Sequence, residues 1–323
     1  MSTVNYKQRI KSLQSLIALV LLCIILSILT DKFFTADNGL NVLRQTAVNI
    51  CIATGMTLVV LTAGIDLSVG SILAFCGAVA AGLLKNGIPI AATDTYIGFT
   101  VLGVILAAII IGGVLGWFNG FVITKFNVPP FVATLAMLTI ARGFTMLYTK
   151  GQPISNLGSK FNFIGSGSFF GIPVPVWIAL VVVLFAVFIT RQTRLGRYIY
   201  AIGGNETAAK FSGIKISNIK MIVYALAGAM AAIGGIIVTS RLDSAQPNAG
   251  NSYELDAIAA VVIGGTSLSG GRGTIWGTVM GAIIIGVLNN GLVLLNVSPF
   301  WQQVVKGGVI LLAVVIDKID KKD

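Results

Sequence analysis

The sequence contains no histidine and is poor in charge: only 10% of its 323 residues are Asp, Glu, Lys or Arg. The absence of histidine excludes His-dependent acid–base catalysis, serine triads and imidazole metal sites. The three cysteines, Cys23, Cys51 and Cys76, each lie inside an apolar run, at the spacing of neither a zinc site nor a redox pair. A soluble domain carries about 25% charged residues. We therefore do not expect a water-soluble globule.

Long apolar segments make up most of the chain, which is 56% hydrophobic. A helix that crosses a bilayer needs roughly 20 apolar residues. Ten candidate segments follow from this criterion, of which the eighth is the shortest: 13–30, 44–63, 67–84, 96–118, 128–149, 174–190, 220–240, 255–268, 274–296 and 300–316. The sequence thus predicts an all-α, polytopic membrane protein with about ten transmembrane helices.

The net charge of +11 is distributed unevenly between the segments. If the N-terminus is cytoplasmic and every segment crosses, fourteen of the 22 Lys and Arg residues lie inside, Lys321 and Lys322 among them, and six lie outside. This is the positive-inside pattern, which predicts cytoplasmic N- and C-termini and removes the need for a nucleic-acid partner. No small-residue cleavage site follows the first apolar segment, so an uncleaved first helix is expected.

A weak internal repeat relates two parts of the chain. Residues 103–112 (GVILAAIIIG) resemble residues 277–286 (GTVMGAIIIG), and an Asn-Gly pair follows each, at 119–120 and at 290–291. Two related halves are a common transporter plan. Chance similarity between helices rich in Gly, Ala and Ile is the alternative interpretation.

Glycines recur every four residues at Gly112, Gly116 and Gly120. Small residues at this spacing let helix backbones approach closely in a membrane. We expect them to pack helices together, and a role in flexing during transport is the alternative.

Residues 268–272 (LSGGR) resemble the signature loop of ATP-binding cassettes. A nucleotide site would also need a phosphate-binding loop that ends in Gly-Lys, and the chain has no Gly-Lys pair. We therefore expect no ATP hydrolysis by this chain. With no histidine and with cysteines at unsuitable spacing, we also expect no catalytic residues, no metal site and no cofactor.

Polar side chains in or beside the apolar segments are candidates for a translocation pathway, because a charge at the bilayer centre costs roughly 2.5–3.5 kcal/mol. The pathway candidates are Asn49, Asp66, Ser68, Asn119, Arg142, Asn289 and Asn290. Structural alternatives remain open for each kind of residue. Asp66 could cap the next helix after Gly64 ends the previous one, Arg142 could form an ion pair, and the amides could bond between helices. Lys306 is expected to snorkel toward the outer interface.

The longest predicted cytoplasmic connection, residues 191–220, carries six of the fourteen inside charges. Asn205 can cap a short helix that runs through Lys210, with Glu206 in its first turn and Gly213 after its end. Such a helix could press on a cytoplasmic partner. A helix that lies on the lipid surface is the alternative.

Four motifs in order carry a family resemblance that covers nearly the whole chain: GIDLSVGS (64–71), TRLGRYIYAIGGNETAA (193–209), YELDAIAAVVIGGTSLSGG (253–271) and IGVLNNGL (285–292). They resemble bacterial sugar-importing ABC transporter permeases. The resemblance implies a single permease domain, residues 1–323, in the bacterial inner membrane. It also implies three protein partners: a second, usually identical permease subunit, a periplasmic sugar-binding protein and a cytoplasmic ATP-binding cassette ATPase.

The same resemblance implies a coupling element that docks on the ATPase within 191–220: Gly204, Asn205, Glu206, Thr207, Ala208, Ala209 and Gly213. The outer loops 150–173 and 241–254 are the longest available surfaces for the binding protein. Permeases for ribose, xylose, allose and galactose share this plan, and ribose is the favoured substrate. An ion-coupled secondary transporter that uses Asp66 or Asp256, and an intramembrane enzyme with both as a carboxylate dyad, are the rival hypotheses.

Overall fold

The computed structural model describes residues 2–90 and 95–319. These residues form thirteen helices: α1 (Ser2–Leu29), α2 (Ala36–Leu61), α3 (Val69–Asn86), α4 (Val101–Lys125), α5 (Pro130–Thr149), α6 (Ser159–Ser166), α7 (Val174–Gln192), α8 (Arg194–Gly204), α9 (Glu206–Phe211), α10 (Ile216–Arg241), α11 (Tyr253–Ile263), α12 (Ile275–Leu294) and α13 (Pro299–Ile319). Short strands lie between them: β1 (Ile88–Ile90), β2 (Thr95–Ile97), β3 (Ile154–Ser155), β4 (Ser168–Phe169), β5 (Ile172–Pro173) and β6 (Ser244–Ala245). The protein is helical, as predicted.

Seven of the described helices are long and apolar enough to cross a membrane: α2, α3, α4, α5, α7, α10 and α12. A shorter apolar stretch, Leu16–Leu29, belongs to α1. Each of the ten predicted segments falls on a helix, but α11 has only 11 residues. At 1.5 Å per residue it is too short to cross a bilayer by itself.

Short strands are where the structure departs from the predicted segments. The expected helix over 96–118 begins only at Val101, because β1 and β2 form an antiparallel hairpin before it. The Thr100 hydroxyl then caps α4 by accepting the Gly103 N–H at 3.2 Å. Strands of two or three residues are too short to show an alternating pattern, so the sequence did not reveal them.

Glycine allows α4 and α10 to lie in backbone contact. A Cβ at Gly112 would come 2.5 Å from the Gly228 oxygen, and one at Gly116 would overlap the Tyr224 carbonyl. Gly120 faces the backbone of Met221 in the same way. The predicted packing role of the three glycines of α4 is therefore confirmed.

The packing of α2–α5 corresponds to that of α10–α13. Helix α10 packs against α3 and α4, and α2 packs against α11 and α12 in the corresponding way. The contact between α3 and α5 likewise corresponds to that between α11 and α13. The two sequence matches, 103–112 and 277–286, lie on the corresponding helices α4 and α12. This pairing agrees with two related halves.

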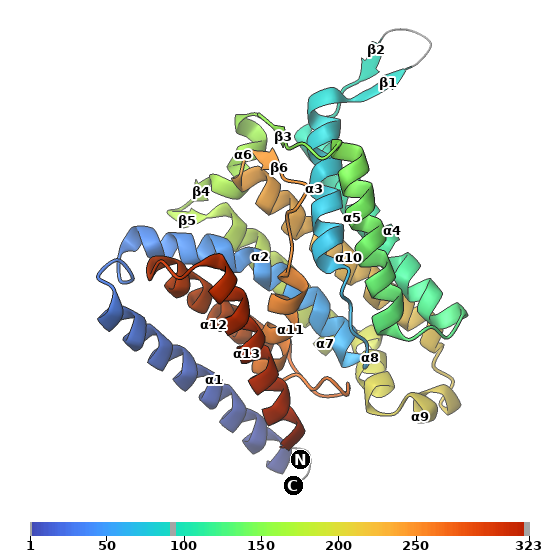
Figure 1. Ribbon diagram of the computed structural model, residues 1–323. Coiled ribbons are helices and arrows are strands. Elements are labelled where there is room, and N and C mark those ends of the chain that lie inside the picture. The colour runs from blue at the N-terminus through green and yellow to red at the C-terminus, as the bar shows by residue number, and fades with distance from the viewer. Residues whose placement is uncertain (1, 91–94, 320–323) are drawn as a thin grey trace.

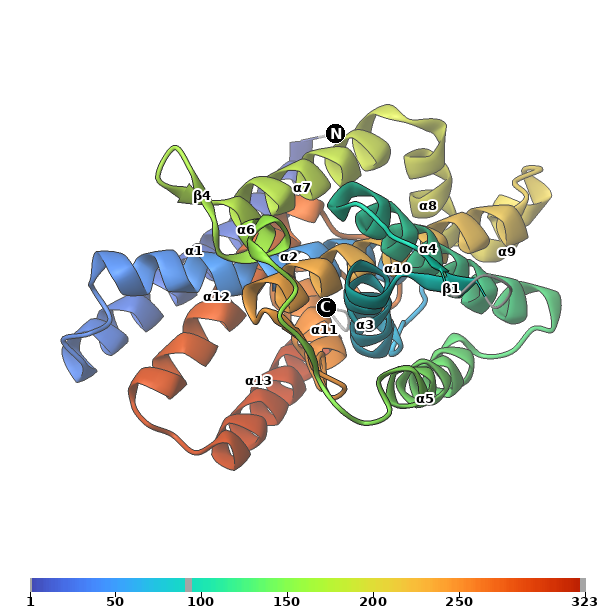
Figure 2. The ribbon, with the colours of Figure 1, turned by 90° about the horizontal axis from the view of Figure 1, so that it is seen from above.

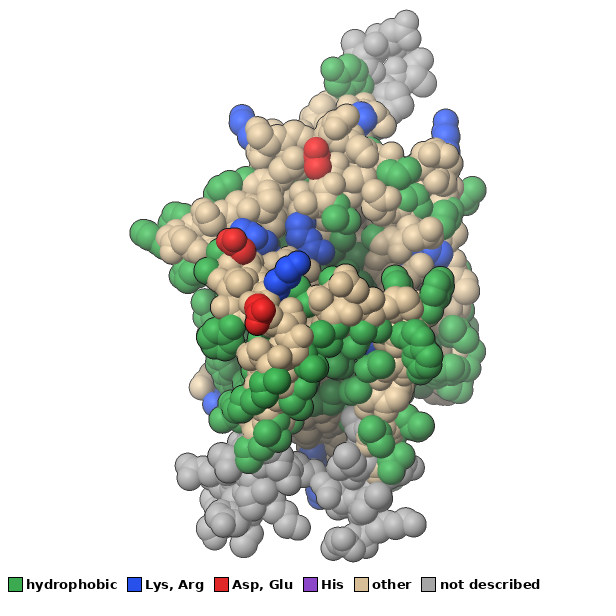
Figure 3. Space-filling model, turned by 60° about the vertical axis from the view of Figure 1, so that its left-hand side comes forward, with side chains coloured by type: hydrophobic (Ala, Val, Ile, Leu, Met, Phe, Trp, Pro, Cys, Tyr) green, Lys and Arg blue, Asp and Glu red, His purple; other side chains and the backbone are tan. Residues whose placement is uncertain are grey.

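The helices lie side by side, and the two ends of the bundle differ (Figure 1). The β1–β2 hairpin projects from one end, while α8, α9, the start of α1 and the end of α13 lie at the other. Lys321 and Lys322, which the sequence analysis assigns to the cytoplasm, lie outside the described residues. Seen from above, α5 and α13 lie on one side of the molecule with α3 and α11 between them (Figure 2). The face in Figure 3 carries most of its visible acidic and basic side chains in the upper half, with hydrophobic side chains predominating below.

Candidate functional site

Three of the predicted pathway residues form one hydrogen-bonded chain at the turn between α2 and α3. Asp66 is fully buried, and its Oδ1 accepts from the Ser68 N–H at 2.9 Å and from the Ser68 hydroxyl at 2.5 Å. The Ser68 oxygen in turn accepts from Nδ2 of Asn119 on α4 at 2.9 Å. The capping interpretation of Asp66 is close to what is observed, because its carboxylate receives a free N–H just before α3. The chain ties the start of α3 to α4.

Two polar atoms beside this chain are buried with no hydrogen-bond partner among the described residues: Asp66 Oδ2 and the Tyr224 hydroxyl. Burial raises the pKa of Asp66 to about 6, and its bonds with Ser68 oppose that shift. Gly64 is needed here for space, since a Cβ on it would come 2.5 Å from the Tyr224 hydroxyl. The left-handed residue after α2 is Ala63, at φ 60°, one residue before the Gly64 that the sequence predicts at this helix end.

The end of α2 also meets α8 and the loop between α11 and α12. The Leu61 carbonyl accepts from the Gly271 N–H at 3.0 Å, and Gly203 of α8 lies directly against the same carbonyl. The Tyr200 hydroxyl of α8 donates to the Gly273 carbonyl at 2.9 Å. Residues 268–272 (LSGGR), which do not form a nucleotide motif, therefore form a glycine-containing turn that packs against α8.

The predicted capped helix in 191–220 is confirmed as α9. Asn205 Oδ1 accepts from the Ala208 N–H at 2.9 Å, and Glu206 pairs with Lys220 of α10 at 2.8 Å. Gly213 follows the helix with φ 83°, a conformation that favours glycine. The structure thus holds α9 in a fixed position on α10.

Helix α9 presents an exposed surface at the end of the bundle shown at the bottom of Figure 1. Residues 204–208 are all exposed, and Ala209 is the buried contact of the helix. Phe211, the last residue of α9, is 87% exposed and adds an aromatic side chain to this surface. Phe211 was not among the predicted site residues, although an aromatic residue directly after Lys210 is visible in the sequence.

Arg142 of α5 holds an irregular segment that precedes α11. Its Nη1 donates to the carbonyls of Pro247 and Ala249, at 2.8 Å each. Arg142 thus clamps backbone carbonyls, and Glu254 of α11 lies near enough to attract its charge. Among the described residues it forms no salt bridge. Gly70 of α3 packs against the Gly250 carbonyl, so the segment lies close to both helices.

Asp256 of α11 is the meeting point of two polar side chains, Asn289 from α12 and Lys306 from α13. The Lys306 ammonium pairs with Asp256 Oδ2 at 3.0 Å, and Asn289 Nδ2 donates to the same oxygen at 3.3 Å. The prediction that Lys306 snorkels is wrong, because a buried carboxylate lies within its reach. Asp256 and Asp66 have separate partners and do not form the dyad of the rival enzyme hypothesis. Within the described ranges, no three His, Cys, Asp or Glu side chains could hold a metal ion.

Asn290 does not join that cluster, since its amide pairs with the amide of Asn38 on α2. Asn290 Nδ2 donates to Asn38 Oδ1 at 2.8 Å, and Asn38 Nδ2 donates back to Asn290 Oδ1 at 3.1 Å. The reciprocal pair is the interhelical bonding that the sequence left open as an alternative. Asn49 lies half-buried on α2.

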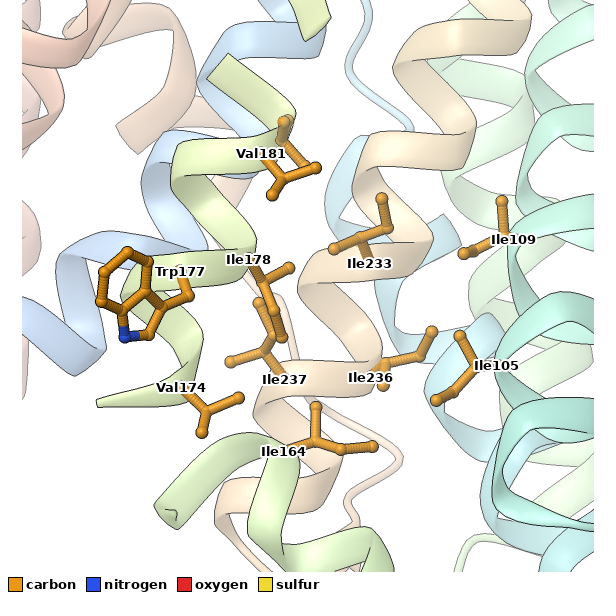
Figure 4. Close-up of a pocket in the computed structure, with 11 residues that line it drawn as sticks. Ile105, Ile109, Ile164, Val174, Trp177, Ile178, Val181, Ile233, Ile236 and Ile237 are labelled. Atoms are coloured by element: carbon orange, nitrogen blue, oxygen red, sulfur yellow. The ribbon is translucent and has the colours of Figure 1, made fainter. Parts of the chain in front are cut away.

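A cavity of about 430 Å³ lies between α4, α7 and α10 (Figure 4). All of its lining residues are hydrophobic, and they include Ile105, Trp177 and Ile236. The indole N–H of Trp177 donates to the Phe169 carbonyl at 3.2 Å. Because an unpaired hydroxyl is costly to bury among apolar groups, this cavity is not suited to a sugar.

Comparison with known proteins places the chain among transport-system permeases. Residues 38–314 match the family described as the permease component of a branched-chain amino acid transport system. The ribose import permease protein of Haemophilus influenzae is 51% identical over 94% of this chain and 92% of its own length. The ribose import permease protein of Bacillus subtilis is 51% identical over 98% and 95%. The galactose/methyl galactoside import permease protein of Salmonella typhimurium is 38% identical over 99% and 98%. No solved structure matches the chain.

Proposed function

This chain belongs to the family of transport-system permease components described above, and on that premise we propose that it is the membrane permease of an ATP-driven ribose importer. Its 51% identity with the ribose import permease proteins, over nearly the whole chain, carries the proposal. The xylose, allose and galactose permeases are also similar, at 35–38% identity. The substrate class is therefore a monosaccharide rather than the branched-chain amino acid in the family's description.

The proposed topology has ten crossings with both termini in the cytoplasm. It is supported by the excess of Lys and Arg on one side and by the position of α8, α9, the start of α1 and the end of α13 at one end of the bundle (Figure 1). The short helix α11 completes its crossing together with the irregular segment 246–252. Non-helical backbone is tolerated at membrane depth where protein surrounds it, and Arg142 supplies hydrogen bonds to that segment.

In the proposed mechanism the permease alternates between outward-open and inward-open states. The cytoplasmic ATPase binds the exposed surface of α9, and nucleotide shifts the equilibrium through its different affinity for the two states. A substrate-binding protein delivers sugar at the opposite end. There β3 pairs with β6, which joins the outer loops 150–173 and 241–254 into one surface.

We also propose that a second copy of this chain completes the pathway. Helices α5 and α13 flank α3 and α11 on one side of the molecule (Figure 2). Both flanking helices expose large apolar side chains: Phe131, Leu135 and Phe144 on α5, and Phe300, Trp301 and Val304 on α13. Two such faces, brought together, would enclose a channel.

Reconstitution tests the function directly. The permease is incorporated in proteoliposomes with the ATPase and binding protein encoded beside it, and uptake of radiolabelled ribose is measured with no ion gradient. The lumen of the proteoliposomes represents the cytoplasm, and we expect uptake to require ATP there. We also expect ribose-loaded binding protein to stimulate the ATPase activity. Uptake driven by an ion gradient without ATP would instead identify a secondary transporter. Uptake of leucine in place of ribose would refute the assignment of ribose as the substrate.

A further inference from the structure

We propose that Asp256, Lys306 and Asn289 form a binding site for sugar hydroxyls inside the permease, in the outer third of its pathway. The inference rests on the proposed function and extends it, because an importer with a selective binding protein does not require a sugar site of its own. The three side chains come from α11, α13 and α12 and converge on one carboxylate oxygen.

The depth of the cluster follows from helix geometry. Asn289 lies five residues before the end of α12 at Leu294, and Lys306 lies seven residues after the start of α13 at Pro299. At 1.5 Å per residue, these side chains lie about 7 to 10 Å below the outer ends of their helices. The hydrocarbon core is roughly 30 Å thick, so the cluster lies below the interface and not at it.

An ion pair at this depth is poorly explained by stability alone. Asp256 is 4% exposed and Lys306 22% exposed, and their desolvation offsets much of their mutual attraction. Well-packed apolar residues at such positions are often equally or more stabilising. Ionisable residues inside transmembrane segments commonly line substrate or ion paths.

The cluster also has unused hydrogen-bonding capacity. Asn289 Oδ1 is buried and has no partner among the described residues. The bonds from Asn289 and Lys306 both end on Oδ2 of Asp256, and no hydrogen bond to Oδ1 is found among the described residues. The Lys306 ammonium has three N–H donors, and Asp256 uses one of them.

This set of groups matches a polyhydroxylated neutral ligand. A sugar hydroxyl donates and accepts at once, so it can donate to Asp256 or Asn289 and accept from Lys306. Hydrogen bonds to ionised groups are stronger than neutral ones. The pair remains neutral overall, which suits an uncharged pentose that must leave again toward the cytoplasm. Arg142 of α5 lies seven residues before the end of its helix, at a similar depth, and bonds to the carbonyls of the segment that leads into α11.

The test separates a binding role from a structural ion pair. The double variant D256N/K306M removes both charges together, so that neither is left buried without its partner. Asn289→Ala removes the free oxygen and leaves the ion pair intact. Lys85→Met is the matched control: it removes a lysine whose ammonium bonds to the Ser155 carbonyl at 2.9 Å, outside the cluster. Each permease is placed in nanodiscs with its ATPase, without binding protein, and titrated with labelled ribose by equilibrium dialysis; uptake is measured in proteoliposomes.

We expect saturable ribose binding in the wild type and in Lys85→Met. Binding should weaken at least tenfold in D256N/K306M and in Asn289→Ala, with a parallel fall in uptake per ATP hydrolysed and unchanged membrane content. Wild-type binding and uptake in the double variant would overturn the inference and leave a structural ion pair. Ribose uptake by a wild type that shows no saturable binding would also overturn it. Failure of the wild type to take up ribose at all would refute the proposed function itself. If the double variant does not insert into the membrane, the ribose binding of Asn289→Ala decides between a binding site and a structural ion pair.

Discussion

Gly203 of α8 lies so close to the carbonyl of Leu61, the last residue of α2, that a Cβ at Gly203 would overlap the Leu61 oxygen. The N–H of Gly271 donates to the same oxygen at 3.0 Å, which brings the α11–α12 loop to this point. Helix α8 leads directly into α9 through Asn205. A force on α9 would therefore be passed to α2 and to the α11–α12 loop through backbone contacts, which have no side-chain rotamers to absorb it.

Substitution of Gly203 by Ala should disrupt this junction. The added methyl group has no space, and overpacking of a tight contact typically costs about 1–3 kcal/mol. We expect a lower unfolding temperature in detergent and at least a tenfold loss of ribose uptake relative to ATP hydrolysis, both measured on reconstituted complexes. Gly39→Ala on α2 is the control, because nothing lies within 4 Å of its added Cβ. Equal uptake by Gly203→Ala and the wild type would show that the junction does not transmit coupling.

The proposed coupling role of α9 predicts that Glu206→Arg and Gly213→Val will separate ATP hydrolysis from uptake. Glu206→Arg places a second cation beside Lys220, and Gly213→Val forces a β-branched residue into a left-handed conformation. Membrane content should stay unchanged, since both positions lie outside the spans. ATP-driven ribose uptake should fall at least tenfold while hydrolysis continues.

Lys220→Met provides the matched control for α9. It breaks the same ion pair without altering the exposed surface, and exposed pairs contribute roughly 0–1 kcal/mol. More than half of the uptake should therefore survive in Lys220→Met. Wild-type uptake in both Glu206→Arg and Gly213→Val would contradict docking at α9.

Local signals in the sequence were sufficient for the helices and for α9. Asn205 and Gly213 mark the limits of α9 because capping depends on a few neighbouring residues. The spacing of Gly112 and Gly116 likewise predicts a close helix contact. Short-range rules of this kind are independent of the tertiary structure, so they can be applied before it is known.

The pairing of polar residues could not be predicted, because it depends on distant parts of the chain. Asp256 and Lys306 are 50 residues apart, and Asn38 and Asn290 are 252 residues apart. In the sequence, Lys306 is close to the predicted outer interface, and no local pattern indicates that it pairs with Asp256. The carbonyls that hold Arg142 belong to an irregular segment whose position is set by packing against α3 and α5.

Asp66 predicts a pH dependence of stability. Its pKa is raised from 3.8 to about 6 by burial, so the folded state holds a proton over a range where the unfolded state has lost it. The stabilising effect is complete below about pH 4 and is lost as the pH rises through 6. A shift of about two pH units corresponds to about 3 kcal/mol. The unfolding temperature in detergent should fall between pH 4.5 and pH 7 by several degrees more for the wild type than for D66N.

The matched control for this pH effect is Asp37→Asn, which changes an exposed carboxylate in the first turn of α2. Its pH profile should follow that of the wild type. A D66N profile that also follows the wild type would show that Asp66 does not cause the dependence.

Adjacent glycines on α4 offer a strict test of the helix contact. A Cβ at Gly112 would lie 2.5 Å from the Gly228 oxygen and 2.7 Å from the Ala232 side chain, whereas the nearest atom to a Cβ at Gly113 is 3.8 Å away. Gly112→Ala must therefore push α4 away from α10, while Gly113→Ala adds a methyl group in ordinary contact and improves helix propensity. We expect Gly112→Ala to lower the unfolding temperature and the yield of folded permease in detergent. Gly113→Ala should match or exceed the wild type in both measurements. Equal stability of the two variants would mean that α4 and α10 do not pack through this glycine face.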